Sequence, residues 1–452
     1  MTHSRFAAII LAAGGGTRMK SAIPKVMHPV AGQPMIAHLL DALRPLTPAV
    51  TVVVIGPRMD AVAKTVAPAE TAIQDPPLGT GDAVRVALNL LDGRFAPQGD
   101  IENILVLYGD TPLLQGETLA RLLAEQDRAP ATILLAGMRP ADPGPYGRLL
   151  SAPDGRILRI VEGADATPEE CAIGLVWGGL MLIRAHHITE LIDGLDRNNA
   201  KREFYLTGIV GLATDNGLRC DAIELPAEEL VGINTRAELA EAEALMQSRL
   251  RHAVMASGVT LVAPETVFLS ADTRLGRDVV VEPNVTFGPG VKVGDGALIR
   301  SFCHLEGAVV GAGAQIGPFA RLRPGAVLEE EVHLGNFVEV KAARLGAGVK
   351  ANHLSYIGDA EVGSRTNIGA GTITCNYDGF KKHRTVIGES VFIGSNTALV
   401  APVTVGDGAY VAAGSVITHE VPADALTIAR GQQVDKPGRA SDIRTRLRGA
   451  KS

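Results

Sequence analysis

The chain has 452 residues, enough for two or three domains that each bury a core of their own. Its 43 lysines and arginines nearly balance its 49 aspartates and glutamates, which argues against wrapping of nucleic acid or binding to an anionic membrane. No apolar run approaches the length that spans a bilayer. We therefore expect a protein of several domains, without membrane insertion and without a nucleic-acid partner.

The cysteines and the N-terminal residues indicate the compartment. Four cysteines lie far apart without a C-x-x-C pair, so neither a zinc ribbon nor a disulfide framework is supported. The apolar residues 6–13 follow Arg5 as in a signal peptide. They continue directly into the glycine-rich residues 14–20, however, and therefore fit a buried first strand better. We expect a cytoplasmic protein.

Residues 1–226 alternate short apolar runs with helical patterns. Continuous apolar runs are typical of strands that are buried on both faces of a mostly parallel sheet. The expected fold is a doubly wound, Rossmann-like α/β domain, in which ligands bind at the carboxyl ends of the strands. The spacing predicts strands over 7–13, 50–55, 104–108 and 131–136, and helices over 35–43, 82–91 and 117–125.

Residues 227–256 are expected to link two domains. The segment 235–256 predicts one uninterrupted helix, because it is rich in helix formers and begins with a capping box of Thr235 and Glu238. Its place between two different hydrophobic periodicities marks it as a connecting arm.

An aliphatic or aromatic side chain recurs every six residues in much of the segment 257–452. Neither a helix nor an amphipathic strand has this period, whereas a coil of short flat strands does. One side chain per hexapeptide would point inward, and successive turns would stack these side chains into an apolar column. The sequence therefore predicts a parallel β-helix. The spacing does not show its handedness, and general crossover rules would favour a right-handed coil. The nineteen positions are Leu269, Leu275, Val281, Phe287, Val293, Ile299, Leu305, Val310, Ile316, Leu322, Leu328, Leu334, Val340, Ile387, Ile393, Leu399, Val405, Val411 and Ile417.

The repeat is interrupted twice before it ends in a tail. Around residues 341–370 the frame shifts, and residues 374–384 have no aliphatic register. We expect the second interruption to be a loop that leaves the coil, and such loops tend to be functional. The tail after Gly431 is polar and basic, which indicates a mobile, solvated segment.

The first predicted strand ends in the glycine-rich residues 14–16. A dinucleotide fingerprint would need a glycine where Met19 stands, and a P-loop would need Gly-Lys-Ser/Thr, which is absent here. What the residues support is a turn whose bare amides can approach phosphate, with Arg18 and Lys25 as cations close behind.

Two more features point to the same site. Asp110 follows the predicted strand 104–108, where a carboxylate beside a phosphate loop is well placed to hold Mg²⁺. Gln74 and the small residues 78–81 precede a helix, whose N-terminus could meet a base or a phosphate.

A second candidate site lies in the coil, where the frame shifts. His353 has Arg323 and Lys341 one or two turns upstream, and these cations could bind an anionic substrate. Glu339 offers a carboxylate that could orient the imidazole. Histidine can remove the proton of an attacking amine at neutral pH, with a typical gain of about 10²- to 10⁴-fold.

Residues 11–25 resemble the signature of sugar-nucleotide pyrophosphorylases. Joined to a long hexapeptide coil, residues 6–435 resemble bacterial bifunctional N-acetylglucosamine-1-phosphate uridyltransferase/glucosamine-1-phosphate acetyltransferases. The resemblance implies that the chain acetylates glucosamine 1-phosphate with acetyl-CoA and then transfers UMP from UTP to N-acetylglucosamine 1-phosphate. The products are UDP-N-acetylglucosamine and pyrophosphate, for cell-wall and lipopolysaccharide precursor supply. It also implies a left-handed coil and a homotrimer with the acetyl-transfer site between coils.

The resemblance also implies roles for individual residues. It makes His353 the general base with Glu339 as a helper, and Asp110 and Asn234 the residues that hold Mg²⁺. It assigns the uridine nucleotide and the sugar nucleotide to Leu11, Ala12, Ala13, Gly14, Lys25, Gln74, Gly79, Thr80, Tyr108, Gly109, Asp110, Gly147, Glu162 and Asn234. It assigns the amino-sugar phosphate to Arg323, Lys341, Tyr356 and Asn367. It assigns acetyl-CoA to Ala370, Asn376, Tyr377, Ser395, Ala413 and Arg430.

One position departs from the family pattern. The family usually has an Asn-Ser/Thr-Gly segment whose asparagine contacts the sugar, whereas this chain has Trp177 followed by two glycines. An indole cannot supply the amide donor and acceptor, so this contact is not carried over.

Three other hypotheses are open. The coil could be a regulatory scaffold for a nucleotidyltransferase alone, as in ADP-glucose-type pyrophosphorylases. Those proteins lack a long coil with an ejected loop and an Asn-His-x-x-Tyr element, which is residues 352–356 in this chain. The coil could be a trimeric zinc carbonic anhydrase with His304, His333 and His353 as ligands. It could also be a trimerisation module without activity, which would leave the phosphate chemistry of the first domain unexplained.

Overall fold

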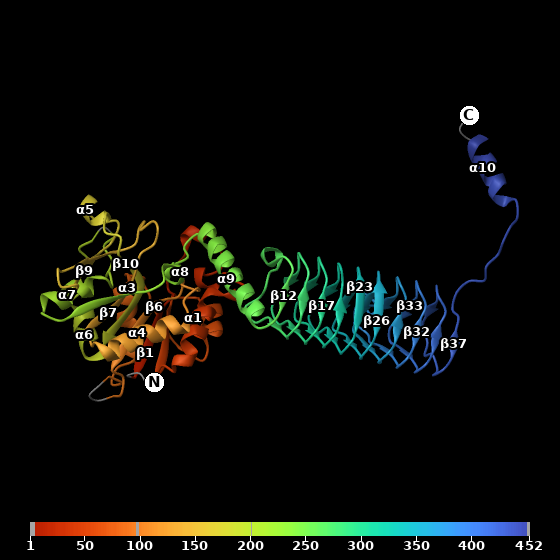
Figure 1. Cartoon of the computed structure of the whole chain (residues 1–452), viewed down its shortest axis with the longest axis horizontal. Coiled ribbons are helices and arrows are strands. Elements are labelled where there is room, and N and C mark those ends of the chain that lie inside the picture. Colours follow the sequence, from red (N-terminus) through yellow and green to blue (C-terminus); the bar gives the residue numbers. More distant parts are fainter. Residues whose placement is uncertain (1–4, 96–98, 200, 450–452) are drawn as a thin grey trace. The chain divides into compact units, whose positions relative to one another are not determined.

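The computed structural model describes residues 5–95, 99–199 and 201–449. The chain divides into two compact units, residues 1–249 (unit 1) and residues 250–452 (unit 2) (Figure 1). Among the helices of the described residues, none has the length and apolar character needed to cross a membrane.

Unit 1 is built on one mostly parallel sheet in the order β11-β7-β10-β6-β1-β4-β5. Only β10 runs antiparallel to its neighbours β6 and β7 in this order, and a hairpin of β8 and β9 extends from β10. The predicted doubly wound α/β fold is confirmed. The strands are β1 (Phe6–Leu11), β4 (Val50–Ile55), β5 (Glu70–Ile73), β6 (Asn103–Tyr108), β7 (Ile133–Met138), β8 (Arg148–Ser151), β9 (Ile157–Val161), β10 (Val176–Arg184) and β11 (Cys220–Glu224), with a separate hairpin of β2 (Pro29–Val30) and β3 (Gln33–Pro34).

Helices cover both faces of this sheet. Alternate residues of β1 enter two cores: Ile9 packs in the core shared with α3, α6 and α7, and Ile10 in the core shared with α1, α2 and α4. Burial of each such side chain contributes about 1.5–3 kcal/mol, which explains the continuous apolar runs. The helices are α1 (Met35–Leu43), α2 (Asp60–Val66), α3 (Thr80–Leu90), α4 (Gly116–Arg128), α5 (Pro168–Cys171), α6 (Ala185–Asp193), α7 (Gly208–Asp215) and α8 (Ala227–Leu230).

The predicted connecting helix is α9 (Arg236–Ala256). The backbone N–H of Thr235 donates to Glu238 Oε2 over 2.9 Å, and the N–H of Glu238 donates to Thr235 Oγ1 over 3.2 Å. These reciprocal bonds are the predicted capping box, which satisfies amides that the first helical turn leaves unpaired.

Unit 2 is a parallel β-helix, as predicted, and its hexapeptide sequence repeat matches the left-handed class. Three stacks of short parallel strands, which we name the β12, β13 and β15 stacks after their first strands, alternate along the chain. The β12 stack consists of β12 (Thr260–Leu261), β14 (Val280–Val281), β17 (Leu298–Ile299), β20 (Gln315–Ile316), β23 (His333–Asn336), β26 (Lys350–His353), β29 (Asn367–Ile368), β32 (Phe392–Ile393), β35 (Tyr410–Val411) and β37 (Leu426–Thr427). The β13 stack consists of β13 (Arg274–Leu275), β16 (Lys292–Val293), β19 (Val309–Val310), β22 (Val327–Leu328), β25 (Arg344–Leu345), β28 (Ala360–Val362), β31 (Thr385–Ile387) and β34 (Val403–Val405). The β15 stack consists of β15 (Thr286–Phe287), β18 (His304–Leu305), β21 (Arg321–Leu322), β24 (Glu339–Lys341), β27 (Tyr356–Gly358), β30 (Ile373–Cys375), β33 (Ala398–Val400) and β36 (Val416–Ile417).

The predicted six-residue positions form the core of the coil. All nineteen are buried except Leu275, which is partly exposed and packs against the same core. The frame shift has a simple origin: the corner from the β15 stack to the β13 stack is sometimes one residue shorter, as between Val340 and Leu345. The apolar column therefore continues through the shift.

The loop and the tail follow in chain order. Residues 376–384 leave the coil between β30 and β31. The predicted loop is thus confirmed except for Thr374 and Cys375, which belong to β30. Asp378 organises this loop, because it accepts bonds of 2.7–2.8 Å from the backbone of Phe380 and Lys381 and from His383 Nε2. The basic tail contains the exposed helix α10 (Arg439–Gly449), which the sequence did not predict.

Candidate functional site

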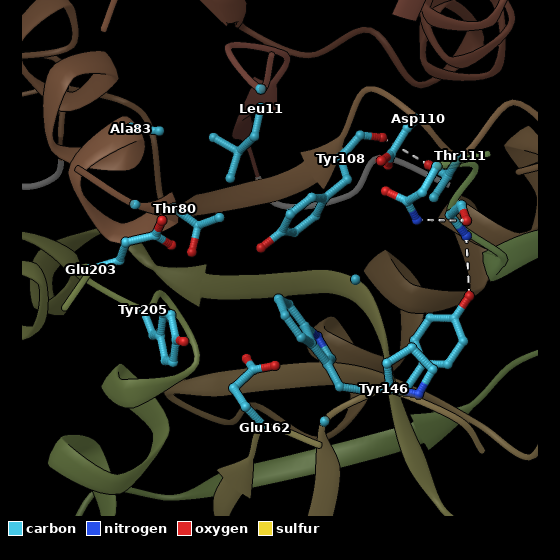
Figure 2. Close-up of a pocket in the computed structure, with 18 of the residues that line it drawn as sticks. Leu11, Thr80, Ala83, Tyr108, Asp110, Thr111, Tyr146, Glu162, Glu203 and Tyr205 are labelled. Carbon is cyan, nitrogen blue, oxygen red and sulfur yellow. Dashed lines mark hydrogen bonds between the residues drawn. The ribbon is translucent and has the colours of Figure 1, made fainter. Parts of the chain in front are cut away.

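A cavity of about 560 Å³ lies at the carboxyl ends of β1 and β6 in unit 1 (Figure 2). Of the predicted nucleotide-site residues, Arg18 and Gly109 do not line it, and Arg18 is exposed on the short 3-10 helix η1 (Thr17–Met19). The fold brings the other predicted residues together around the cavity, although they lie up to 223 positions apart in the chain. The predicted residues that line the cavity are Leu11, Ala12, Ala13, Gly14, Lys25, Gln74, Gly79, Thr80, Tyr108, Asp110, Gly147, Glu162 and Asn234.

Lys25 lies between the two residues predicted to hold a metal ion. Its Nζ forms a short hydrogen-bonded ion pair with Asp110 Oδ2 and donates to Asn234 Oδ1 over 3.0 Å. The side chains of Lys25 and Asp110 are largely buried, at 15% and 12% exposure. Lys25 begins η2 (Lys25–Met27), Asp110 follows β6, and Asn234 precedes α9. Two oxygens thus converge on a point that holds positive charge.

The three glycines after β1 have different roles. A Cβ atom at Gly14 or Gly15 would have no neighbour within 4 Å, so these residues leave open space in front of the turn. Gly16 has φ +57°, and a Cβ there would lie 2.7 Å from Lys25 Cβ. Gly16 therefore allows the turn to pack on Lys25, whereas Gly14 and Gly15 keep the amides accessible to a ligand.

The helix start at residues 79–81 carries a structural constraint that the sequence did not reveal. A Cβ at Gly79, which has φ +117°, would lie 2.6 Å from the carbonyl oxygen of Phe204. Gln74 Nε2 donates to Gly79 O over 2.9 Å, and Thr80 Oγ1 accepts from the N–H of Leu206 over 3.0 Å. These residues line the cavity and also hold the segment 201–206 against it.

One wall of the cavity is aromatic. The rings of Tyr108 and Trp177 meet edge to face with centroids 5.7 Å apart. Trp177 Nε1 donates to Leu180 O over 3.0 Å, so its donor is used inside the protein. Tyr108 and Glu162 point toward each other across the cavity (Figure 2). Burial raises the pKa of both groups, and Thr207 Oγ1 donates to Glu162 over 2.8 Å.

Sequence reasoning missed several lining residues. Tyr146 lines the cavity and accepts from the N–H of Gly232 over 3.3 Å. Its neighbour Gly147 was predicted, and an aromatic residue beside a predicted contact was the available signal. Lys201, Glu203 and Tyr205 approach from the segment 201–206, for which no local pattern pointed to the site.

In unit 2, His353 lies at the end of β26 and is exposed. Its Nδ1 is 2.8 Å from Oδ1 of Asn336, its register partner on β23. Because an amide oxygen accepts, Nδ1 carries the proton and Nε2 is left as the basic nitrogen. Glu339 was expected to orient this imidazole, and that expectation is wrong in this structure. Its carboxylate instead accepts from Arg323 Nη1 over 2.9 Å.

Cations gather around Lys341, which ends β24 of the β15 stack, and they include Arg323 and Lys382. Lys341 Nζ is 3.9 Å from Asp359 Oδ2. The neighbouring Lys382, and then burial, lower the pKa of the Lys341 ammonium. Like charges that crowd one another favour an anionic ligand between them. Lys382 belongs to the loop 376–384 and was not predicted as a site residue.

Tyr356 and Asn376 meet next to Asp359, the carboxylate that lies near Lys341. Asn376 Nδ2 donates to Asp359 and lies 3.4 Å from Tyr356 Oη. A Cβ at Gly358 would lie 2.4 Å from Tyr356 Oη and 2.6 Å from the nearest atom of its ring, so the bare glycine leaves room for the phenol. The predicted Asn367 begins β29, which pairs directly with β26.

The remaining predicted residues follow one corner of the coil, from the β12 stack to the β15 stack. Backbone bonds connect successive turns: Gly371 N–H to His353 O over 3.2 Å, Asn396 N–H to Ala370 O over 2.7 Å, and Gly414 N–H to Ser395 O over 2.8 Å. Arg430 Nη1 continues this line by donating to Ala413 O over 2.6 Å. The predicted Tyr377 lies on the ejected loop with 61% exposure. A row of small residues thus runs along the coil from the imidazole to a guanidinium.

The histidines of the zinc hypothesis lie on different strands. His304 belongs to the β15 stack, whereas His333 and His353 belong to the β12 stack. Within residues 5–95, 99–199 and 201–449 of one chain, no three His, Cys, Asp or Glu side chains gather as metal ligands.

Comparisons with known proteins bear on both units. Residues 8–164 match the MobA-like NTP transferase domain, and residues 272–307 and 384–419 match the bacterial transferase hexapeptide (six repeats). The whole chain is similar to relatives named "Bifunctional protein GlmU". The relative from Paramagnetospirillum magneticum is 54% identical and covers 98% of both chains. Those from Acidiphilium cryptum and Sphingopyxis alaskensis are 55% and 52% identical, over 97% and 100% of this chain and 98% and 99% of their own.

Proposed function

This chain belongs to the family of bifunctional GlmU proteins, and on that premise we propose how its two units carry out their reactions. The chain is an enzyme with a uridyltransferase and an acetyltransferase activity, which supply a cell-wall precursor. We assign uridylyl transfer to the cavity of unit 1 and acetyl transfer to the corner of the coil at His353. The observation that carries this division is that Lys25 lies with Asp110 and Asn234 in the cavity of unit 1, whereas Lys341 and Lys382 lie together on the coil that carries His353.

In unit 1, the phosphate oxygen of N-acetylglucosamine 1-phosphate would attack the α-phosphorus of UTP and expel pyrophosphate. The open amides at Gly14 and Gly15 would approach the phosphates of UTP. The Lys25 ammonium would neutralise charge that develops on the transferred phosphoryl group. Arg18, which is exposed near the turn, would assist from outside the cavity.

Mg²⁺ would be held by Asp110 and Asn234. Their oxygens already converge on the Lys25 ammonium, so the donor set favours a cation. Mg²⁺ prefers oxygen ligands and is often bound by one or two carboxylates together with substrate phosphates and water. When bound, the ion would supply further charge neutralisation of the phosphates.

In unit 2, the amine of glucosamine 1-phosphate would attack the thioester carbonyl of acetyl-CoA. His353 Nε2 would accept the amine proton while the N–C bond forms, and the proton would pass to the CoA sulfur as the C–S bond breaks. Arg323, Lys341 and Lys382 would bind the phosphate of the sugar. Tyr356 and Asn367 would contact the same substrate.

Acetyl-CoA would lie along the corner that runs from His353 to Arg430. The small residues Ala370, Ser395 and Ala413 leave room there for the pantetheine arm, and Arg430 would meet its phosphorylated end. Asn376 and Tyr377, at the base of the ejected loop, would cover the cofactor. We propose that acetylation comes first, because it supplies the acetylated sugar phosphate that unit 1 uses.

We also propose a homotrimer formed through the coil, with the acetyl-transfer site between coils. Hexapeptide coils favour oligomers, and one corner of this coil exposes a ladder of Phe302, Phe319 and Phe337. Their rings stack at 4.9 and 5.2 Å, and all three residues have φ between +56° and +63°. Exposed aromatic residues in the left-handed region carry a steric cost of about 1–2 kcal/mol each, which a covered interface would offset.

The domain boundaries and the compartment belong to the same proposal. We assign residues 1–226 to the uridyltransferase domain, 227–256 to the linker and 257–452 to the acetyltransferase domain. The four cysteines are free thiols, which supports a reducing, cytoplasmic setting.

Product analysis tests the whole scheme. The full chain is incubated with UTP, acetyl-CoA, glucosamine 1-phosphate and Mg²⁺, and with each component left out in turn. We expect UDP-N-acetylglucosamine from the complete mixture and N-acetylglucosamine 1-phosphate when UTP is omitted. Release of CoA only after UTP addition would overturn the proposed order. UDP-sugar formation without any acetyl transfer would favour the scaffold hypothesis for the coil.

A further inference from the structure

Arg236, the first residue of α9, contacts the loop that carries Lys25. Its Nε donates to the carbonyl oxygen of Met19 over 3.3 Å. Its Nη1 lies 3.2 Å from Nδ1 of His28. One guanidinium thus connects the start of α9 with both ends of the segment 19–28.

His28 is built to accept this contact. The imidazole is 1% exposed, and burial followed by the charge of Arg236 lowers its pKa. A neutral imidazole can accept on Nδ1, whereas its Nε2 has no hydrogen-bond partner within the described parts of the chain. The backbone holds His28 from both sides, since its N–H donates to Lys25 O over 3.2 Å and its carbonyl accepts from Met35 over 3.1 Å.

The contacts of Arg236 join the same two parts of the chain as the Lys25–Asn234 contact in the cavity, namely the segment 19–28 and the start of α9. Met19 and His28 bracket Lys25 along the chain, and Asn234 lies two residues before Arg236. Lys25 Nζ and Asn234 Oδ1 are 3.0 Å apart. Any shift of the loop against α9 therefore changes the geometry of Lys25, Asn234 and Asp110 together.

We propose that Arg236 is a positioning residue for uridylyl transfer, which fixes Lys25 relative to Asn234 through Met19 and His28. This inference rests on the proposed assignment of uridylyl transfer to unit 1. Arg236 does not line the cavity, so its effect passes through the residues that do. A displacement of about 1 Å at the reacting groups can cost about a hundredfold in rate.

Kinetics of full-length variants test this role. Arg236→Met removes the donors and keeps the stem, and Arg236→Lys keeps one charge without the fork. We expect Arg236→Met to lower kcat for uridylyl transfer about 10- to 100-fold. UTP affinity, measured by calorimetry without turnover, should change less than kcat. Arg236→Lys should fall between, and acetyl transfer in the same samples should stay at the wild-type rate.

Two controls separate positioning from general packing. Arg128→Met removes an exposed guanidinium that pairs with Glu125 at the end of α4, and it should leave both activities unchanged. Glu243→Gln weakens a different contact between α9 and the same region, a 2.6 Å bond from the N–H of Ala31. If Glu243→Gln matched the loss of Arg236→Met, docking of α9 in general would explain the effect and the proposal would be wrong.

The His28 side of the contact gives an independent test. His28→Asn keeps an acceptor, whereas His28→Leu removes it and keeps the volume. We expect His28→Leu to resemble Arg236→Met, His28→Asn to retain most activity, and the double variant Arg236→Met/His28→Leu to be no worse than either single variant.

Chemical rescue completes the test. Because Arg236 is exposed, guanidinium ions at non-denaturing concentration should restore part of the kcat of Arg236→Ala. Wild-type rates in Arg236→Met, or equal loss of both activities, would overturn the positioning role. A wild-type chain without any uridylyl transfer would instead refute the proposed function.

Discussion

The two candidate sites are assembled in opposite ways. In unit 1, Lys25 meets Asp110 and Asn234 across 85 and 209 positions of sequence. In unit 2, His353 meets Asn336 across 17 positions, which is one turn of the coil. A site in the α/β unit thus depends on the closure of the whole domain, whereas a site in the coil repeats a short local geometry at successive turns.

This difference predicts how each unit responds to amino-acid substitutions. Each turn of the coil contacts mainly its neighbours, so a change at one turn acts locally. In unit 1 the same few side chains join the glycine-rich loop, the end of β6 and the start of α9. Changes there are expected to alter several contacts at once.

The largest expected effect is at Asp110. Asp110→Asn keeps the shape but removes the negative charge that faces Lys25, and the affinity of the site for a cation falls with it. We expect uridylyl transfer to fall by at least about a thousandfold, because several kcal/mol of charge stabilisation are lost. Acetyl transfer by the same protein should be unchanged, and a coupled loss of both would show that the units are not independent sites. Separate assays of pyrophosphate and CoA release measure the two rates.

The matching change in the coil is His353→Ala. We expect acetyl transfer to fall about 10²- to 10⁴-fold, while uridylyl transfer from N-acetylglucosamine 1-phosphate stays at the wild-type rate. Asn336→Ala should act in the same direction but more weakly, because it frees the ring without removing the base. Retention of acetyl transfer by His353→Ala would identify another base.

The same contrast explains what the sequence could predict. The six-residue spacing located the core of the coil almost residue by residue, because an inward position such as Leu322 is defined by its own turn. The apolar runs located β1, β4, β6 and β7, but not the reversed direction of β10. A strand that is buried on both faces has the same composition whether it runs parallel or antiparallel.

The site residues that sequence reasoning missed are those placed by tertiary contacts. The approach of the segment 201–206 depends on the close packing of Phe204 against Gly79, which no local pattern records. Asn336, not Glu339, faces the imidazole, because register along a stack pairs Asn336 with His353. Asn336 and Glu339 both lie roughly one coil turn before His353 in the sequence, so their distance along the chain did not show which of them contacts the imidazole. Lys382 lies on a loop outside the repeat, where spacing makes no prediction.

Because the coil repeats its geometry at each turn, it can also repeat an exposed side chain, as in its phenylalanine ladder. Phe319→Asn tests whether the ladder of Phe302, Phe319 and Phe337 is covered in a homotrimer. Asparagine tolerates the left-handed conformation better than phenylalanine, so the turn itself should not be destabilised. We expect weaker association, seen by analytical ultracentrifugation as dissociation at concentrations where the wild type is assembled, together with reduced acetyl transfer. Unchanged assembly would place the interface elsewhere.

The smallest expected effect concerns pH and distinguishes the buried cavity from the exposed imidazole. Burial raises the pKa of Glu162 in the folded chain, so the native state holds this proton at pH values where the unfolded state, with an ordinary pKa near 4.3, has lost it. The free energy of unfolding of unit 1 should therefore fall as the pH rises from about 4.3 through the folded pKa. Glu162→Gln can still accept from Thr207 and cannot ionise, so its stability should depend less on pH over the same range. Trp177 is the single tryptophan of the chain and lies in unit 1, so its fluorescence during urea unfolding reports this unit alone. Parallel pH profiles for wild type and Glu162→Gln would show that the carboxyl titrates as it does in water, and that the cavity is wetter than its aromatic wall indicates.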